Sequence, residues 1–295
     1  MSFSGMVKEE ISKNVSNARH CQLAEFAAIV QFCCQISVGE DGRSYFRLST
    51  ENEAVSRKYF TLLKKTFNIC TANDLSDDEV WSIMQSLKLV EPSGVLHSLS
   101  DPVNPMLLKK SCCKRAYLRG AYLCIGSMSD PKGSYHLEMV CQSREQAGQI
   151  CEILKDFELD GKIIERKRHF VVYMKEGSGI VDFLNICEAH VALMEMENER
   201  IVKEVRNSVN RRVNCEAANI TKTVNAATRQ IAEIELLRDK YGFQNLPSGL
   251  REMAEVRLEH PDATLAELGK FLSSPVGKSG VNHRLRQLSV IARDL

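Results

Sequence analysis

The chain has 295 residues, with 39 Lys and Arg against 38 Asp and Glu, which gives a net charge of +1. This length allows two or three domains. The near-zero charge excludes a uniformly basic surface, so contacts with nucleic acid must come from local clusters. No apolar run of about 18 residues is present, which excludes a membrane-spanning helix. The N-terminal residues include acids and no apolar run, so we expect no secretory signal.

Eleven cysteines are present, an odd number that includes the adjacent pairs Cys33–Cys34 and Cys112–Cys113. A disulfide framework is not expected at this length without an export signal, so we predict reduced thiols in a cytoplasmic protein. Cys187 and His190 have a spacing typical of metal ligands, and His20–Cys21 could complete a site. Because no C-x-x-C or H-x-x-x-H element accompanies them, we predict no metal and no cofactor.

The first hundred residues predict a mixed α and β structure. Residues 1–18 predict an amphipathic helix and residues 20–36 a buried helix, followed by a hairpin signal at 39–42 and a strand at 45–48. Helix starts are predicted by pairs with the spacing of capping boxes, here and further along the chain: Thr50 and Glu53, Ser76 and Glu79, Ser143 and Gln146.

The pattern repeats after a link rich in proline and glycine. Residues 114–126 predict a second buried helix, residues 128–133 a loop and residues 134–141 a strand. Further strands at 162–166 and 169–175 and a helix at 178–188 extend the second half. One offset of 92 residues aligns helix, strand and helix: Phe26 with Leu118, Leu48 with Val140, and Leu62 with Leu154. We predict a duplicated α-β-β-α domain over residues 1–195, with halves at about 1–100 and 106–195.

Small residues occupy the centres of both buried helices, at Ala27–Ala28 and Gly120–Ala121. They would let the two helix backbones approach closely, at a pseudo-twofold axis between the halves. The alternative is two ordinary core helices in separate domains. Two basic clusters in this part of the chain could contact a nucleic-acid backbone or serve only as solubilising surface: residues 109, 110, 114, 115 and 119, and residues 162 and 166–168.

Residues 196–245 predict a helical basic linker. Between Arg200 and Gln230 there are seven basic residues against two acids, and several asparagines weaken helical continuity, so we expect a broken helix or an ordered linker. Arg211, Arg212 and Lys222 are candidates for phosphate contacts. A solvated helix face is the alternative reading.

The last segment, residues 246–295, predicts an all-α helix-turn-helix domain. Thr264 and Glu267 form a capping box for the first helix, and residues 273–277 turn the chain. Ser279 is expected to cap the second helix. The buried stripe of that helix is predicted to comprise Val281, Leu285, Leu288 and Ala292.

The opposite face of the second helix is the candidate DNA-reading surface. Arg pairs with guanine and Asn with adenine in the major groove, so an exposed helix bearing both suits that groove. We expect Ser279, Asn282, His283 and Arg286 near base edges, and Lys278 and Arg284 on phosphates. The alternative is a helical hairpin with a solvated polar face.

The two buried helices resemble the paired signature helices of the LAGLIDADG homing-endonuclease fold, in the stretches FAAIVQFCC (26–34) and LRGAYLCIG (118–126). The resemblance places metal-binding acids of active nucleases at Cys33 and Ile125. Neither side chain supplies the hard oxygen ligands that Mg²⁺ requires, and cleavage by two metals needs an acid from each half. We therefore predict a protein that is not an enzyme.

The whole chain is similar to the WhiA family of bacterial DNA-binding regulators. Long stretches carry this resemblance in order: QLAEFAAIV (22–30), AYLRGAYLCIGSMSDP (116–131), NRRVNCEAANITKTVNAATRQI (210–231) and GKSGVNHRLRQL (277–288). The implied fold is α+β, a degenerate LAGLIDADG-like domain followed by an all-α helix-turn-helix domain.

The resemblance implies a transcription regulator of the cell cycle, acting in cell division, chromosome segregation and, in spore formers, sporulation. Its expected partner is double-stranded DNA, with another regulator or RNA polymerase in addition. A cytoplasmic, nucleoid-associated location is expected, with no membrane contact. The alternative is a protein-interaction adaptor of the division or chromosome machinery that is only tethered to DNA.

Overall fold

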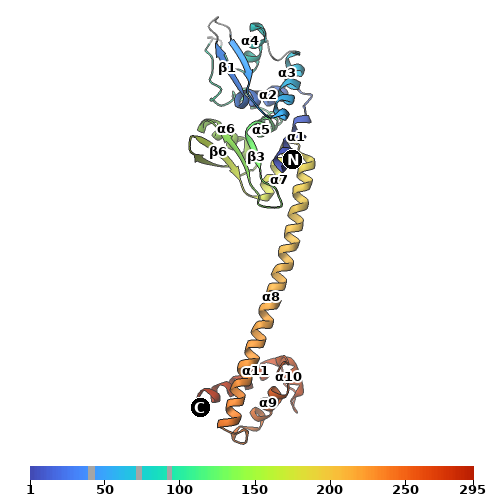
Figure 1. Ribbon diagram of the computed structural model, residues 1–295, viewed down its shortest axis with the longest axis vertical. Helices are drawn as coiled ribbons and strands as arrows, with labels where there is room; N and C mark the ends of the chain where they lie inside the picture. Colours follow the sequence, from blue (N-terminus) through green and yellow to red (C-terminus); the bar gives the residue numbers. More distant parts are fainter. Residues whose placement is uncertain (39–43, 71–74, 92–94) are drawn as a thin grey trace. The chain divides into compact units, whose positions relative to one another are not determined.

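The computed structural model describes residues 1–38, 44–70, 75–91 and 95–295. It divides into two compact units, Met1–Lys203 and Glu204–Leu295 (Figure 1). The hairpin signal predicted at residues 39–42 lies outside the described residues. No helix in the described ranges has both the length and the apolar character needed to cross a bilayer.

The first unit is built from two copies of one α-β-β-α arrangement, as the offset of 92 residues predicts. The helices that open the two copies, α2 and α5, begin and end 92 residues apart. The first copy comprises α2 (Arg19–Cys33), β1 (Cys34–Val38), β2 (Ser44–Leu48) and α3 (Glu53–Phe67). The second comprises α5 (Ser111–Ile125), β3 (Gly126–Met128), β4 (Leu137–Cys141) and α6 (Arg144–Lys155).

The strands form separate antiparallel sheets in the two halves. In the described residues β1 pairs with β2, while the second half has a four-stranded sheet in the order β3-β4-β6-β5. The added strands are β5 (Lys162–Arg166) and β6 (His169–Met174). The remaining elements of the unit are α1 (Phe3–Lys13), α4 (Asp77–Ser86), the 3-10 turn η1 (Pro105–Leu108) and α7 (Gly177–Ile186).

Helices α2 and α5 pack directly on each other in the centre of the unit, which confirms the predicted close crossing. Ala28 and Ala121 are fully buried. A Cβ atom added to Gly120 would lie 2.7 Å from the backbone oxygen of Glu25 and 3.0 Å from the Cβ of Ala28. A glycine is needed at this position because α2 occupies the space of a side chain.

A buried ion network joins the two copies around the same crossing. Glu25 of α2 is fully buried and accepts hydrogen bonds from Nε of Arg119 at 2.9 Å and from its Nη2 at 3.1 Å. The Nζ of Lys58, on α3, lies 2.9 Å from the same carboxylate, and Arg119 also reaches Glu188 at 2.8 Å. Since an unpaired buried charge is costly, the buried side chains of Glu25, Lys58 and Arg119 depend on their mutual pairing.

Several sequence-based element boundaries were wrong. The helix predicted for residues 20–36 ends at Cys33, because the next residues pair with β2. Gly126–Met128 is a strand that begins directly after α5, although residues 114–126 were predicted as helix and 128–133 as loop. Asn52, whose side chain accepts from the Ala54 N–H, caps α3 in place of Thr50. The capping boxes at Ser76 and Ser143 are confirmed.

The expected interruption between the two modules is absent from the described chain: α8 runs from His190 to Lys240 as one helix. Its sequence contains neither Gly nor Pro, and each asparagine costs only about 0.7 kcal/mol relative to alanine. Thr221, Thr223 and Thr228 donate their hydroxyl protons to carbonyls four residues earlier. Their side chains therefore form hydrogen bonds within the helix and do not interrupt it.

The second unit packs three helices against the C-terminal part of α8. They are α9 (Ser248–Glu259), α10 (Leu265–Phe271) and α11 (Lys278–Arg293), preceded by the 3-10 turn η2 (Phe243–Asn245). Gly242 ends α8 with a φ of 80°, and its N–H donates to the Leu237 oxygen. Ile234 and Leu237 of α8 share the core of this unit with the buried leucines of α9 to α11.

Replacing Gly120 by Ala tests the helix crossing. Its Cβ would press on the backbone of α2, so we expect the free energy of unfolding to fall by about 1–3 kcal/mol. Urea unfolding of the full chain, followed by the fluorescence of the single tryptophan, Trp81, measures the effect in the first unit. Gly148→Ala is the matched control, because nothing lies within 4 Å of its added Cβ. Equal stability of the two variants would contradict the account.

Candidate nucleic-acid interface

Helices α10 and α11 form the helix-turn-helix arrangement predicted for the C-terminal segment. The Thr264 side chain accepts from the Glu267 N–H, and the Glu267 carboxylate accepts from the Thr264 N–H at 2.8 Å, which confirms the capping box. Helix α11 begins at Lys278, with Gly277 at the N-cap and no side-chain cap. The prediction that Ser279 caps this helix was wrong, because the cap lies two residues earlier, at Gly277, and Ser279 is already inside the helix.

The turn between the two helices is held tightly by backbone contacts. The N–H of Val276 donates to the oxygen of Gly269 at 3.0 Å. A Cβ on Gly269 would lie 2.2 Å from the Val276 oxygen, so only glycine fits. Glu252 of α9 accepts from the Ser273 N–H, and this hydrogen bond lowers the pKa of the Glu252 carboxyl.

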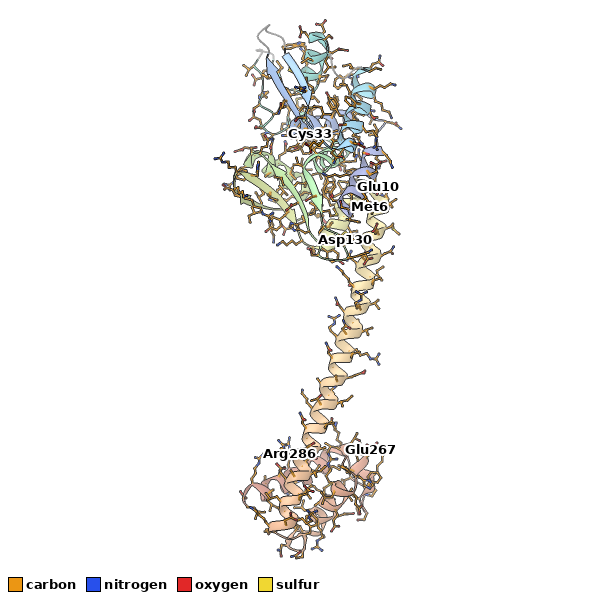
Figure 2. All side chains as sticks on the ribbon, viewed as in Figure 1. Met6, Glu10, Cys33, Asp130, Glu267 and Arg286 are labelled. Atoms are coloured by element: carbon orange, nitrogen blue, oxygen red, sulfur yellow. The ribbon has the colours of Figure 1, made fainter. Side chains whose placement is uncertain are left out.

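Helix α11 presents its two faces as the sequence predicts. Its core stripe, Val281, Leu285, Leu288 and Ala292, is buried. Lys278, Ser279, His283 and Arg286 are exposed, and Asn282 is half-buried. The face expected to read DNA, which includes Arg286 (labelled in Figure 2), is therefore opposite the buried stripe of the helix.

Arg284 lies differently from its neighbours on α11. It is half-buried, and its guanidinium carbon would be 3.7 Å from a Cβ on Gly249 of α9. Its Nη1 atom is buried with no hydrogen-bond partner. The side chain thus packs against α9 instead of extending into solvent beside Lys278, and its contact with a phosphate stays a prediction.

A groove of about 460 Å³ runs between α8, α10 and α11 within the second unit. Lys278, Asn282 and Arg286, spaced four residues apart on α11, line it together with Lys222 of α8. No carboxylate is among its described lining residues. The basic residues that line the groove are Lys222, Arg229, Arg257, Lys278 and Arg286.

Arg257, one of the groove residues, was missed in the sequence analysis. It is only 2% exposed, its Nη1 donates to the Ala263 oxygen at 2.7 Å, and its Nε has no partner. Desolvation lowers the pKa of its guanidinium. Its spacing in the sequence indicates burial, since Arg257 lies four residues after Met253 and three after Ala254, on the core-facing side of α9.

The three α8 residues proposed for phosphate contacts are not grouped together. Lys222 lines the groove, whereas Arg211 and Arg212 are exposed on α8 and are not among the groove residues. Arg212 is paired with Glu216 at 3.1 Å. Arg229, which was counted only as part of the basic linker, is the α8 residue that joins Lys222.

The positions that the resemblance aligns with nuclease acids lie at the C-terminal ends of α2 and α5. Cys33 is the last residue of α2 and Ile125 the last of α5. A hydrogen bond with Cys124 lowers the pKa of the Cys33 thiol, and the positive charge of Lys8 acts in the same direction. Thiols and an ammonium group do not supply the oxygen ligands that Mg²⁺ requires. Asp130, an acid that follows the second of these helices in the chain, lies in an exposed loop, where it accepts from the Lys132 N–H.

Most of the side chains in the basic cluster at residues 109–119 that the structure places form contacts within the protein: residues 114, 115 and 119. Arg119 is buried in the ion network, Lys114 lies 2.5 Å from Asp156, and the guanidinium of Arg115 stacks over Phe157 at 5.4 Å. Of the two predicted basic clusters in this unit, the one on β5 and the following turn is the more exposed.

Comparison with known proteins matches both units to one family. Three family descriptions match in chain order: "WhiA N-terminal LAGLIDADG-like domain" over residues 19–74, "WhiA LAGLIDADG-like domain" over 114–206 and "WhiA C-terminal HTH domain" over 209–292. A "Probable cell division protein WhiA" from Lachnoclostridium phytofermentans is 51% identical over 100% of this chain and 99% of its own. The chain belongs to the WhiA family.

Other WhiA proteins support the assignment over the full length. A "Probable cell division protein WhiA" from Alkaliphilus oremlandii is 45% identical, with 100% of this chain and 98% of the relative covered. The crystal structure of full-length WhiA from Thermotoga maritima matches with a TM-score of 0.59 and 27% identity, covering 100% of this chain and 99% of that one. The match to the WhiA HTH domain begins within α8, so every groove residue lies inside it.

Replacing Gly269 by Ala tests the turn that positions α11. Because its Cβ would collide with the Val276 backbone, we expect a loss of about 1–3 kcal/mol of unfolding free energy in the second unit. Faster hydrogen–deuterium exchange of α10 and α11 amides reports this loss. Gly249→Ala is the control, since its Cβ meets only ordinary contacts at 3.7 Å. Protection equal to wild type in Gly269→Ala would show that the turn tolerates a side chain.

Proposed function

We propose that this WhiA protein is a sequence-specific DNA-binding transcription regulator that reads DNA with α11. The observation that carries the proposal is the arrangement of cationic and amide side chains at one groove whose described lining residues include no carboxylate. Lys278, Asn282 and Arg286 share one face of α11, and Lys222 and Arg229 face them from α8. Such a set combines base readout with neutralisation of phosphates.

The α11 residues divide by position into two roles. Arg286 and Asn282 are assigned to base edges, and the exposed Ser279 and His283 lie beside them on the helix surface. Lys278, at the first turn of α11, is assigned to a phosphate together with Lys222 and Arg229 of α8. Arg284 is assigned a minor role, because its guanidinium packs against α9.

The first unit is proposed to have lost nuclease chemistry. Two-metal cleavage requires oxygen ligands from both halves, and the aligned positions hold Cys33 and Ile125. The positive charge of Lys8, which contributes to the lowered pKa of the Cys33 thiol, further disfavours a divalent cation there. We therefore assign this unit a binding or scaffolding role and expect no cleavage of DNA in Mg²⁺.

The processes served are proposed from the family. Relatives carry the name "Probable cell division protein", and we extend cell division, chromosome segregation and, in spore formers, sporulation to this chain. The proposed location is the cytoplasm at the nucleoid, with double-stranded DNA as partner. Another regulator or RNA polymerase is proposed as the protein partner that would turn DNA binding into transcriptional control.

A second candidate function, a protein-interaction adaptor tethered to DNA, is favoured by the surface of α8. Valines at regular spacing are exposed there: Val205 by 59%, Val209 by 53% and Val213 by 55%. Exposed apolar side chains in a row are typical of surfaces that a partner covers. This candidate differs from the first in that α11 would contribute little to the choice of DNA sequence.

Replacing Arg286 by Ala tests the first candidate. Loss of a bidentate contact with guanine should weaken binding to selected DNA by about 1–3 kcal/mol and relax the preference at one base pair. Selection of a site from random duplexes, followed by fluorescence anisotropy at fixed salt, measures both effects.

Arg293→Ala is the matched control for this experiment. Arg293 is an exposed arginine in the last turn of the same helix and lies outside the groove. Its loss removes the same charge, so it should change affinity less and leave the base preference unaltered. An Arg286→Ala variant that keeps wild-type affinity and preference would refute the assignment of α11 and favour the adaptor.

A further inference from the structure

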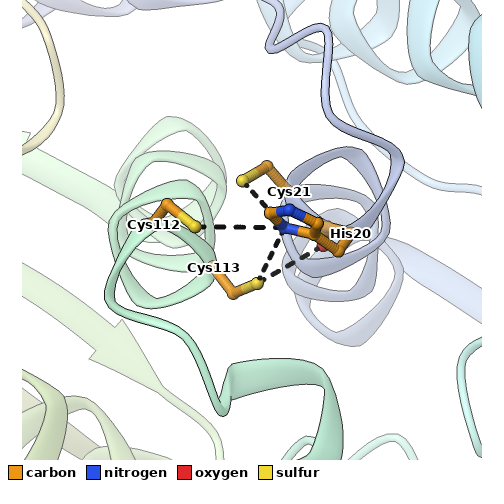
Figure 3. Close-up of side chains that lie close together, drawn as sticks. All are labelled: His20, Cys21, Cys112 and Cys113. Atoms are coloured by element: carbon orange, nitrogen blue, oxygen red, sulfur yellow. Dashed lines mark hydrogen bonds between the residues drawn. The ribbon is translucent and has the colours of Figure 1, made fainter.

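Four side chains of the types that commonly bind metals, one histidine and three cysteines, lie close together where α2 and α5 begin (Figure 3). His20 and Cys21 lie in the first turn of α2, and Cys112 and Cys113 in the first turn of α5. Their ligand atoms all lie within 4.8 Å of one another. The Nδ1 of His20 is 3.3 Å from the sulfurs of Cys21 and Cys113 and 3.9 Å from that of Cys112.

We propose that these residues bind one Zn²⁺ ion as a structural Cys3His site. Zinc takes thiolate sulfur at about 2.3 Å and imidazole nitrogen at about 2.1 Å in a tetrahedron. Such a tetrahedron places neighbouring ligand atoms roughly 3.5–3.8 Å apart. The distances from the Nδ1 of His20 to the three sulfurs, 3.3 to 3.9 Å, span this range. Three thiolates and an imidazole select zinc over the harder Mg²⁺ and Ca²⁺.

The site is closed, which makes it structural instead of catalytic. Four protein ligands fill the tetrahedron and leave no position for a water molecule or substrate. Cys21 and Cys113 are buried, at 5% and 3% exposure, and hold the interior side of the cluster. His20 and Cys112 are exposed, so an ion can enter from solvent.

The internal duplication explains how the ligand set arises. His20 and Cys112 are separated by 92 residues, as are Cys21 and Cys113, which is the same offset that relates α2 to α5. Each half therefore supplies two adjacent ligands from the first turn of its central helix. The ion would tie the two halves together at the N-terminal ends of α2 and α5.

This ligand pattern also explains why the sequence analysis predicted no metal. The ligands are adjacent pairs far apart in the chain, and neither pair has the C-x-x-C spacing of common zinc sites. The sequence pointed to Cys187 and His190 as possible companions of His20. Neither belongs to the group of ligands that the described chain brings together.

A disulfide is the competing use of these cysteines. All eleven cysteines are free thiols in the structure, and a disulfide between two of the three clustered cysteines would leave the third and His20 without a function. Zinc uses all four ligands. The two readings predict different chemistry under reducing conditions, where a zinc site persists and a disulfide does not.

The full chain, purified with a reducing agent, should bind one Zn²⁺ per molecule by mass spectrometry of the metal content. Co²⁺ in place of Zn²⁺ should give the visible absorption of tetrahedral cobalt with thiolate ligands. Cys112→Ser and His20→Gln, both at exposed positions, should lose most of this absorption and bind Zn²⁺ at least tenfold more weakly. Cys215→Ser is the matched control, since Cys215 is an exposed thiol on α8.

Chelation of the metal provides a readout that does not depend on the variants. Removal of Zn²⁺ should lower the melting temperature of the first unit in wild type and in Cys215→Ser, and added Zn²⁺ should restore it. Absence of stoichiometric metal and of the cobalt spectrum in the wild type would overturn the proposal. So would unchanged zinc binding in Cys112→Ser and His20→Gln, or a disulfide at the cluster in reducing buffer.

Discussion

The close approach of α2 and α5 is the constraint on which the rest of the first unit depends. Without a side chain at Gly120, the backbone of α5 comes within contact of the Glu25 carbonyl, and the two halves share one core. That closeness brings the Glu25 carboxylate into the reach of Arg119 from the other half, so a charge that would be costly alone becomes fully paired. It also sets the distance between the side chains that the two helices carry at their ends. At the C-terminal ends these are Cys33 and Ile125, and at the N-terminal ends they form the cluster that contains His20 and Cys112.

These two ends indicate how a nuclease scaffold can be put to another use. The positions aligned with metal-binding acids hold Cys33 and Ile125, and we propose that the shape of the fold has been kept while the nuclease chemistry was lost. The opposite end gains soft ligands arranged for a metal that stabilises and does not react. A scaffold changed in this way suits presentation of a surface, and DNA reading is assigned to the second unit, where α11 carries Asn282 and Arg286.

Local patterns predicted much of this fold from the sequence. The offset of 92 residues, the capping boxes at Ser76, Ser143 and Thr264 and the buried stripe of α11 depend on neighbours within a few residues or on strict repetition, and all appear in the structure. What failed depends on tertiary contacts. Arg119 looked like a surface cation because its partner Glu25 is 94 residues away. Arg284 looked exposed until α9 was placed beside it. The asparagines of α8 predicted a break, but the helix is continuous because its sequence contains neither Gly nor Pro.

The central claim is that the exposed face of α11 directs this protein to particular DNA sequences. Genome-wide DNA occupancy in the native cell, compared between the wild type and an Asn282→Ala, Arg286→Ala double variant at equal protein levels, tests it most directly. The account predicts discrete sites that share a sequence pattern in the wild type and lose occupancy in the variant. Sites that remain fully occupied in the variant, or a wild type without discrete sites, would contradict it.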